Sequence, residues 1–311
     1  MKRRFAMVMA AMMAAGMLAG CSGKAEETTA VQTTAAETEA AEAETAAASG
    51  EAEAEEPASE AAEAASEEEA ASEAAASGEE TEILVAAAAS LKNAYEEELI
   101  PMFEEANPGV TVSGTYDSSG KLQTQIEEGL EADVFMSAAT KQMDALNEEG
   151  LIASDTIVNL LENKIVLIVP SSSDLGLTAF EDIAKAETIA LGDPASVPAG
   201  QYAEEALTNL GIWDSIQDKV SFGTNVTEVL NQVAASSADA GIVYATDAGS
   251  MADQVTVIAE APEGSLAEPV IYPVAVVANS AHPDEANAFV EFLKTDEAMA
   301  VFEAYGFSAG Q

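Results

Sequence analysis

The sequence predicts an α/β protein of two lobes, each a mainly parallel sheet flanked by helices. Two observations lead to this prediction. Apolar runs of strand length alternate with helical patterns from about residue 81 to the end of the chain, an order typical of parallel sheets covered on both faces. The alternating region is also long, about 230 residues with roughly ten strands, which suits two lobes better than one sheet.

The elements follow from local pattern. Short β-rich runs, several bounded by Gly or Pro, predict strands at 83–88, 110–116, 133–137, 165–169, 188–191, 241–244, 255–258 and 272–278. Apolar residues at helical spacing predict helices at 91–105, 121–128, 284–294 and 297–305. Further helices are expected to start at the Val197-Pro198-Ala199-Gly200 and Thr224-Asn225-Val226-Thr227 loops.

The apolar runs at 165–170 and 271–278 are the best candidates for the passages between lobes. We therefore expect a discontinuous first lobe, 81–164 with 267–311, closed by the C-terminal helices. The second lobe is expected to span 165–266.

The first 21 residues predict an export signal. Lys2, Arg3 and Arg4 precede an apolar run too short for a stable membrane span. The run ends in Leu18-Ala19-Gly20-Cys21, which resembles the bacterial lipoprotein signal, in which the cysteine is lipidated and becomes the mature N-terminus. Lipidation of Cys21 would hold the protein outside the cytoplasmic membrane by acyl chains. The alternative is an ordinary cleavable signal with a chance cysteine.

Residues 22–80 predict an acidic, disordered tether. Of these 59 residues, 22 are Ala and 18 are Glu, so the segment cannot bury enough apolar area to offset the entropy of ordering it.

Charge excludes several function classes. Eleven basic residues against 56 acidic ones give a formal net charge of -45, which argues against nucleic acid or an anionic lipid surface as a partner. From residue 81 onward the net charge is -31, and all seven basic residues are Lys. One Cys and one His in the chain leave little material for a disulfide framework, an imidazole metal site or a Ser-His-Asp triad.

The predicted loops at the carboxyl ends of the strands could bind an anion. Ligands of open α/β sheets bind at these ends. Several of the loops open helices, whose first N–H groups are unpaired and carry partial positive charge. Ser90, Ser119 and Tyr244 add hydroxyl donors. Taken singly, a serine at a helix start more often serves as a cap, so the prediction depends on the set.

The set resembles the molybdate-binding proteins of ABC-type molybdate importers, over roughly residues 82–308. The similar segments are Ala86 to Leu91, Ser118-Ser119, Ala132 to Ser137, Gly192 to Ala203, Gly241 to Tyr244, Tyr272 to Val277 and Phe302 to Phe307. The run from Gly192 to Ala203 is the most specific of them.

The resemblance implies a hinged, two-lobed periplasmic-binding-protein fold of type II that closes on one tetrahedral oxyanion. It implies hydroxyl and backbone N–H donors from Ser90 and Ser119, backbone N–H donors from Ala199 and Val226, and the phenol of Tyr244. Molybdate or tungstate would be cargo, with no direct bond from protein to molybdenum and no cofactor. The partners it implies are a membrane permease and its ATPase, and we expect a monomer without enzymatic activity.

One departure from the family is Asp117 and Lys121, which flank Ser118-Ser119 where small or neutral residues are more usual. We expect them to form a local pair facing solvent. An inward-pointing Asp117 would oppose a dianion.

Rival hypotheses stay open at this point. The same architecture could take another tetrahedral oxyanion such as sulfate or phosphate, or a carboxylate, although a carboxylate normally calls for an Arg. A hydrolase using Ser90 or Ser119 would lack a histidine partner. Gly120-Lys121 superficially resembles a phosphate-binding loop, but its glycine spacing differs and Leu122 stands at the Ser or Thr position.

Overall fold

The computed structural model describes residues 80–310. The predicted export signal, Cys21 and the tether up to residue 79 lie outside the described residues. Within 80–310, no helix is both long and apolar enough to cross a membrane.

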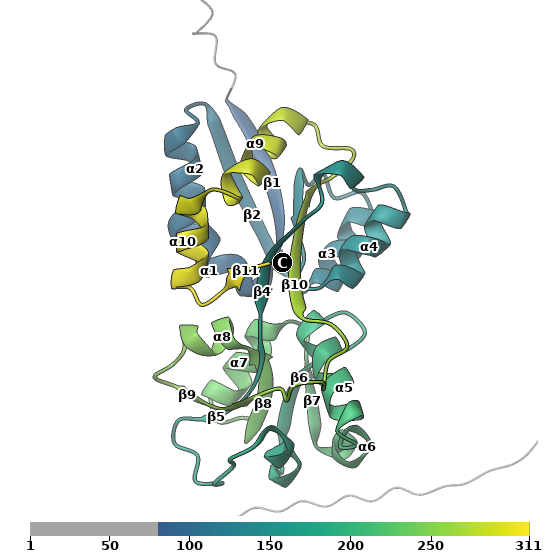
Figure 1. Cartoon of the computed structure of the whole chain (residues 1–311), viewed down its shortest axis with the longest axis vertical. Helices are drawn as coiled ribbons and strands as arrows, with labels where there is room; N and C mark the ends of the chain where they lie inside the picture. Colours follow the sequence, from purple (N-terminus) through teal and green to yellow (C-terminus); the bar gives the residue numbers. More distant parts are fainter. Residues whose placement is uncertain (1–79, 311) are drawn as a thin grey trace, which may run out of the picture. The chain divides into compact units, whose positions relative to one another are not determined.

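The described chain forms two mixed sheets with helices packed on them (Figure 1). The six-stranded sheet has the order β11-β4-β10-β3-β1-β2. Its strands are β1 (Thr81–Ala88), β2 (Val110–Asp117), β3 (Val134–Met136), β4 (Val158–Asn163), β10 (Val270–Val276) and β11 (Ser308–Ala309). The five-stranded sheet has the order β7-β6-β8-β5-β9. Its strands are β5 (Ile165–Pro170), β6 (Ile189–Gly192), β7 (Val220–Gly223), β8 (Ala240–Tyr244) and β9 (Val255–Glu260).

The helices divide between the sheets in the same way. We call the six-stranded sheet and its helices the first lobe. Its helical segments are η1 (Ala89–Leu91), α1 (Lys92–Ala94), η2 (Tyr95–Leu99), α2 (Ile100–Ala106), α3 (Ser119–Glu127), α4 (Thr140–Glu148), η3 (Ser154–Thr156), α9 (Pro283–Leu293) and α10 (Asp296–Ala304). The second lobe is the five-stranded sheet with η4 (Phe180–Lys185), α5 (Pro198–Asn209), α6 (Trp213–Ile216), η5 (Gln217–Lys219), α7 (Val226–Ala234) and α8 (Ala245–Ser250).

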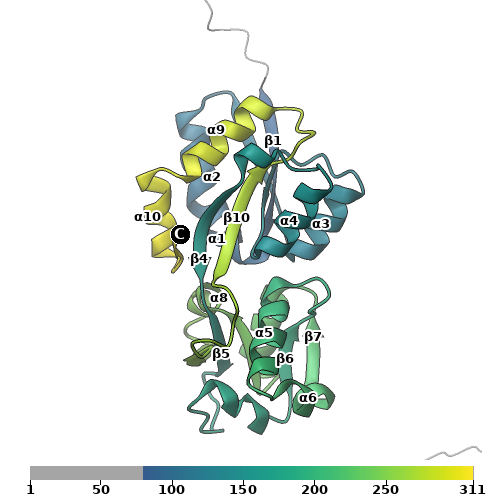
Figure 2. The same cartoon turned by 45° about the vertical axis from the view of Figure 1, so that its right-hand side comes forward.

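Alternation along β1 shows why its sheet is buried on both faces. Ile83, Val85 and Ala87 pack into a core with the aromatic side chains of η2, α2, α9 and α10. Ala86 faces the opposite way, into a core with Leu122 of α3 and residues of α4. The two views show these helix groups on opposite faces of the sheet (Figures 1 and 2). The α/β class predicted from the alternating pattern is confirmed.

The sheets are mixed, where the sequence predicted mainly parallel ones, because the strands at the passages between the lobes run antiparallel to their neighbours. β1 pairs in parallel with β2 and β3, and β6 pairs in parallel with β7 and β8. The strands next to the passages, β4, β5, β9 and β10, pair antiparallel with their neighbours. β5 starts two residues after β4 ends and continues into the other sheet. This connection is too short to hold the crossover that parallel strands require. The lobe boundaries in the sequence analysis stay a prediction.

The two passages lie side by side. Ala261 N donates to Ile165 O over 2.8 Å, and the ammonium group of Lys164 lies 3.0 Å from the carboxylate of Glu260. Two adjacent strand ends therefore form the connection on which the lobes can turn.

The loops of the two lobes touch in this structure. Gly120 N in α3 donates to Ser196 O over 2.9 Å, and Gln142 Nε2 in α4 donates to Gln201 Oε1 in α5 over 3.2 Å. A Cβ on Gly120 would lie 2.7 Å from Ser196 Cα and closer still to its carbonyl oxygen. The closed arrangement of the lobes thus requires glycine at position 120.

We predict that Gly120→Ala shifts the protein towards an open arrangement without destabilising the first lobe, because the obstacle is Ser196 of the other lobe. Spin-label distances between Lys141→Cys in α4 and Asp214→Cys in α6 measure the separation of the lobes. The distance should lengthen in the variant.

Gly249→Ala in α8 is the matched control, since a Cβ there would meet nothing within 4 Å. Identical distance distributions for Gly120→Ala and this control would contradict the prediction.

Candidate functional site

A small cavity of about 10 Å³ lies where loops of the two lobes meet, with room for roughly one water-sized body. It is lined by Ala88, Ala89, Ser90, Asp117, Ser118, Ser119, Ala138, Val197, Pro198, Ala199, Val226 and Tyr244. All five site residues predicted from the sequence are among them. Their roles as ligands stay a prediction, but the structure brings the five together.

Three helices begin at this cavity. Ser119 and Val226 are the first residues of α3 and α7, and Ala199 is the second residue of α5. Backbone N–H groups at these positions have no acceptor within the helix and carry the positive end of the helix dipole. Together they form a positive region built without a cationic side chain.

Two glycines bring α5 close to the end of β6. A Cβ on Gly200 would lie 2.5 Å from Gly192 C and closer to its oxygen, and one on Gly192 would lie 2.6 Å from Val197 Cγ1. The end of β6 at Gly192 and the first turn of α5 at Gly200 therefore have no room for a side chain. The specific Gly192 to Ala203 run thus has a local cause: it allows the N-terminus of α5 to reach the cavity.

The hydroxyl of Ser90 contacts a buried phenol behind the cavity. Asn163 Nδ2 donates to Tyr272 Oη over 3.2 Å, and Tyr272 Oη lies 3.0 Å from Ser90 Oγ. Either hydroxyl can be the donor in the contact between Tyr272 and Ser90. Where Tyr272 donates, the proton of Ser90 is free to point into the cavity. Ser90 lies inside η1 and is not the N-cap of that segment or of α1.

Ser119 and Tyr244 meet at Ala138. Ser119 Oγ accepts from Ala138 N over 3.0 Å, which leaves the hydroxyl proton of Ser119 available. Tyr244 Oη, in the other lobe, donates to Ala138 O over 3.2 Å. Burial raises the pKa of Tyr244 well above its usual value, and the nearby Tyr272 and Asp247 raise it further, so the phenol remains a donor.

Ser118 is a cavity residue that sequence reasoning did not assign. Its side chain is buried and its Oγ has no hydrogen-bond partner among the described residues. Ser118 occupies the N-cap of α3 but makes no side-chain cap. A buried hydroxyl without a partner beside an anion site is an additional donor, and the Ser-Ser pair in the sequence was the available signal.

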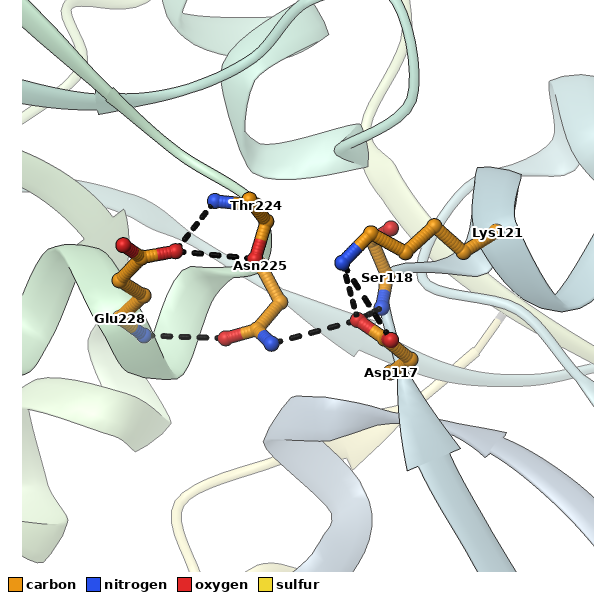
Figure 3. Close-up of polar contacts among 6 residues, drawn as sticks. All are labelled: Asp117, Ser118, Lys121, Thr224, Asn225 and Glu228. Atoms are coloured by element: carbon orange, nitrogen blue, oxygen red, sulfur yellow. Dashed lines mark hydrogen bonds and ion pairs between the residues drawn. The ribbon is translucent and has the colours of Figure 1, made fainter.

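Asp117 lines the cavity, but its carboxylate is occupied (Figure 3). Lys121 Nζ lies 3.2 Å from Oδ1, which also accepts from Ser118 N over 2.8 Å and from Asn225 Nδ2 over 3.2 Å. The predicted local pair with Lys121 is confirmed. The pair is only partly exposed, because Asn225 of the other lobe covers it.

A larger groove of about 760 Å³ adjoins the cavity. It is lined by Ala89, Lys92, Gly114, Thr115, Tyr116, Asn225, Thr227, Glu228, Asn231, Gln232 and Ser237. It contains the cation of Lys92, the carboxylate of Glu228 and neutral groups, and of the five predicted site residues it includes none. Across residues 80–310, no group of three His, Cys, Asp or Glu side chains could hold a metal ion.

Two lobes joined by adjacent strand ends, with a cavity where their loops meet, are the architecture of a solute-binding protein. Comparison with known proteins agrees with this class. The family model for bacterial extracellular solute-binding proteins matches residues 83–308. The chain belongs to this family, and it is an extracytoplasmic binding protein rather than an enzyme.

Individual relatives are similar over most of their length. A Bacillus subtilis protein described as an ABC transporter substrate-binding lipoprotein is 42% identical, with 73% of this chain and 86% of that protein covered. The molybdate-binding protein of Haemophilus influenzae is 40% identical, with 73% and 90% covered.

Solved structures show the same fold. The substrate-binding domain of a molybdenum ABC transporter from Clostridium difficile has 38% identity and a TM-score of 0.59, covering 74% of this chain and all of that one. The periplasmic molybdate-binding protein of Azotobacter vinelandii has a TM-score of 0.65 at 22% identity, covering 74% of this chain and all of that one. At that identity the second likeness concerns the fold alone.

Asp247, a buried carboxyl in the first turn of α8, leads to a prediction about pH. Burial raises the pKa of its carboxyl to about 7, against a usual 3.8, although backbone hydrogen bonds lower it. One oxygen has no partner in the described structure. The folded state therefore loses stability as the pH rises from about 4 to about 7, and the penalty is fully present above that range.

We expect Asp247→Asn to abolish this penalty. The variant should gain stability over the wild type progressively between pH 4 and 7, by up to about 4 kcal/mol. Urea unfolding of both proteins across this range measures the difference. A difference that does not change with pH would contradict the raised pKa, whatever its size.

Proposed function

We propose that this protein captures molybdate, and tungstate with similar affinity, and delivers it to an ABC importer. The observation that carries the proposal is the small cavity, where N–H and O–H donors from both lobes converge on one point. The molybdate-binding proteins of Haemophilus influenzae and Escherichia coli, 40% and 38% identical to this chain, support the choice of ligand.

The donors suit a doubly charged tetrahedral ion. We assign oxygen contacts to the hydroxyl groups of Ser90, Ser119 and Tyr244 and to the backbone N–H groups of Ser119, Ala199 and Val226. Hydrogen bonds to an ionised acceptor are shorter and stronger than neutral ones. With a net charge of -31 from residue 81 onward, attraction must come from such short-range contacts rather than from the long-range field.

The same donors discriminate against other oxyanions. Hydrogen phosphate carries a proton that needs an acceptor, and the one carboxylate lining the cavity, Asp117, already accepts from three groups. Sulfate needs only donors but is smaller than molybdate. In a site closed around the larger ion its hydrogen bonds would be stretched and weaker.

Binding is coupled to hinge closure because the donors belong to two lobes. A ligand shifts a conformational equilibrium only by its difference in affinity for the two states. An ion held by Ser90 and Ser119 alone could not favour closure, whereas added contacts to Ala199, Val226 and Tyr244 do. The cavity is small, so its walls must move apart to admit the ion, and Tyr244 must turn from Ala138 O.

We extend the proposal to location and partners. Lipidation of Cys21 would anchor the monomeric protein to the outer face of the cytoplasmic membrane, with residues 22–80 as a tether. The closed form would then dock on a permease driven by an ATPase. The Bacillus subtilis relative, described as a lipoprotein of an ABC transporter, supports this arrangement.

An oxyanion panel tests the ligand. We expect molybdate and tungstate to raise the melting temperature of the full-length protein to a similar extent, since a ligand bound only by the folded state stabilises it. Sulfate and phosphate should have much smaller effects. Sulfate affinity equal to that of molybdate, measured by calorimetry, would contradict the proposed size selection.

Loss of hydroxyl donors tests the site. Ser90→Ala combined with Tyr244→Phe should weaken molybdate binding by at least about 100-fold, because each donor to a charged group contributes roughly 1.5–3 kcal/mol. Unchanged affinity would mean that these residues are wrongly assigned.

Tyr272→Phe tests our assignment of Tyr272 as the donor to Ser90 Oγ. With that donor removed, the Ser90 hydroxyl is held less well as a donor to the ion. We expect a loss of about 10-fold in molybdate affinity, roughly 1.4 kcal/mol, although Tyr272 does not line the cavity. The loss should disappear in a Ser90→Ala background; an additive loss there would show that Tyr272 acts by another route.

A further inference from the structure

A cross-lobe hydrogen bond joins Asn225 of the second lobe to Asp117 of the first. Asn225 Nδ2 donates to Asp117 Oδ1 over 3.2 Å, next to the ammonium group of Lys121 (Figure 3). Asp117 lines the small cavity and Asn225 lines the larger groove. The contact therefore stands where the two spaces adjoin.

The orientation of the Asn225 amide is fixed by α7. Asn225 is the N-cap of this helix, and its Oδ1 accepts from Glu228 N over 3.0 Å. With the amide oxygen committed to the helix, the amide nitrogen must point the other way. It points at Asp117. The Asn225 side chain thus does two things. It caps α7, the helix that carries the Val226 N–H, and it hydrogen-bonds to the opposite lobe.

The loop before α7 is held by a second set of contacts. Thr224 N and Oγ1 both donate to one carboxylate oxygen of Glu228, over 2.6 and 2.9 Å. These hydrogen bonds lower the pKa of Glu228, and the nearby charge of Lys121 lowers it further. The charge of Lys121 therefore acts on carboxylates of both lobes: its ammonium pairs with Asp117, and it lowers the pKa of Glu228.

The contacts of Asp117, Lys121 and Asn225 thus distinguish these three residues from the proposed oxyanion donors. Lys121 does not line the small cavity, and its ammonium is paired with Asp117. The cation would then not contact the ion, and its pairing with Asp117 would weaken the repulsion between that carboxylate and the ion. What the group can do is tie the lobes together beside the ion.

We propose that Asp117, Lys121 and Asn225 form a clasp that holds the closed form and positions the Val226 N–H against the bound oxyanion. These are positioning residues rather than direct ligands. The inference rests on the proposed function for its ligand, but the clasp itself is a contact between lobes and can be tested without any ligand.

A charge exchange tests the clasp. Asn225→Asp keeps a good N-cap for α7 but places a second carboxylate opposite Asp117, and like charges at this distance repel. Molybdate affinity should fall about 10-fold or more, with faster release. Adding Asp117→Asn restores one amide and one carboxylate across the contact, and affinity should return to within about 3-fold of wild type.

Asn231→Asp is the matched control. It lies in the same helix and lines the same groove, and it adds the same charge away from Asp117. We expect at most about a 2-fold change for this variant. An equal loss in Asn225→Asp and Asn231→Asp would assign the effect to net charge and overturn the clasp.

Spin-label distances between the lobes separate this inference from the proposed function. Without ligand, Asn225→Asp should open the lobes relative to wild type, and the double variant should close them again. This outcome supports the clasp even if wild-type protein fails to bind molybdate, which would overturn only the ligand assignment. A double variant as open as Asn225→Asp, or Asn225→Asp as closed as wild type, would overturn the clasp.

Discussion

The proposed site is governed by one constraint: a cavity for a dianion must be lined by donors in a protein with almost no cations to spare. Seven lysines stand against 38 acidic residues from residue 81 onward. The fold meets this constraint by starting α3, α5 and α7 at one point, so that backbone N–H groups supply the positive potential. Hydroxyl groups complete the set, and the one carboxylate that reaches the cavity, Asp117, is neutralised by Lys121.

Because these donors belong to two lobes, the packing between the lobes becomes part of the binding site. Gly120 permits close approach at Ser196, Tyr244 reaches across to Ala138, and Asn225 reaches Asp117. Behind the cavity, Tyr272 contacts the Ser90 hydroxyl and accepts from Asn163, at the end of β4. Ligand contacts and hinge contacts are therefore neighbours, which is how a single small ion can change the balance between open and closed forms.

Local pattern was sufficient for the fold class and for the five loops around the cavity, because strand ends and helix starts are marked by short-range residue preferences. It was not sufficient for contacts made across the chain. One partner of the Asp117 carboxylate is Asn225, 108 residues away, and sequence pattern does not show that the buried Ser118 hydroxyl has no partner among residues 80–310. Several elements were also missed, among them α4, α6, α8, β4 and β7; β4 lies where the chain leaves one sheet for the other.

The most direct test is a crystal structure of the full-length protein with molybdate. The account predicts one ion in the small cavity, its oxygens within about 3.2 Å of donors from Ser90, Ser119, Ala199, Val226 and Tyr244. No lysine nitrogen should contact it. An ion held by Lys92 or Lys121, or seated in the larger groove, would contradict the account.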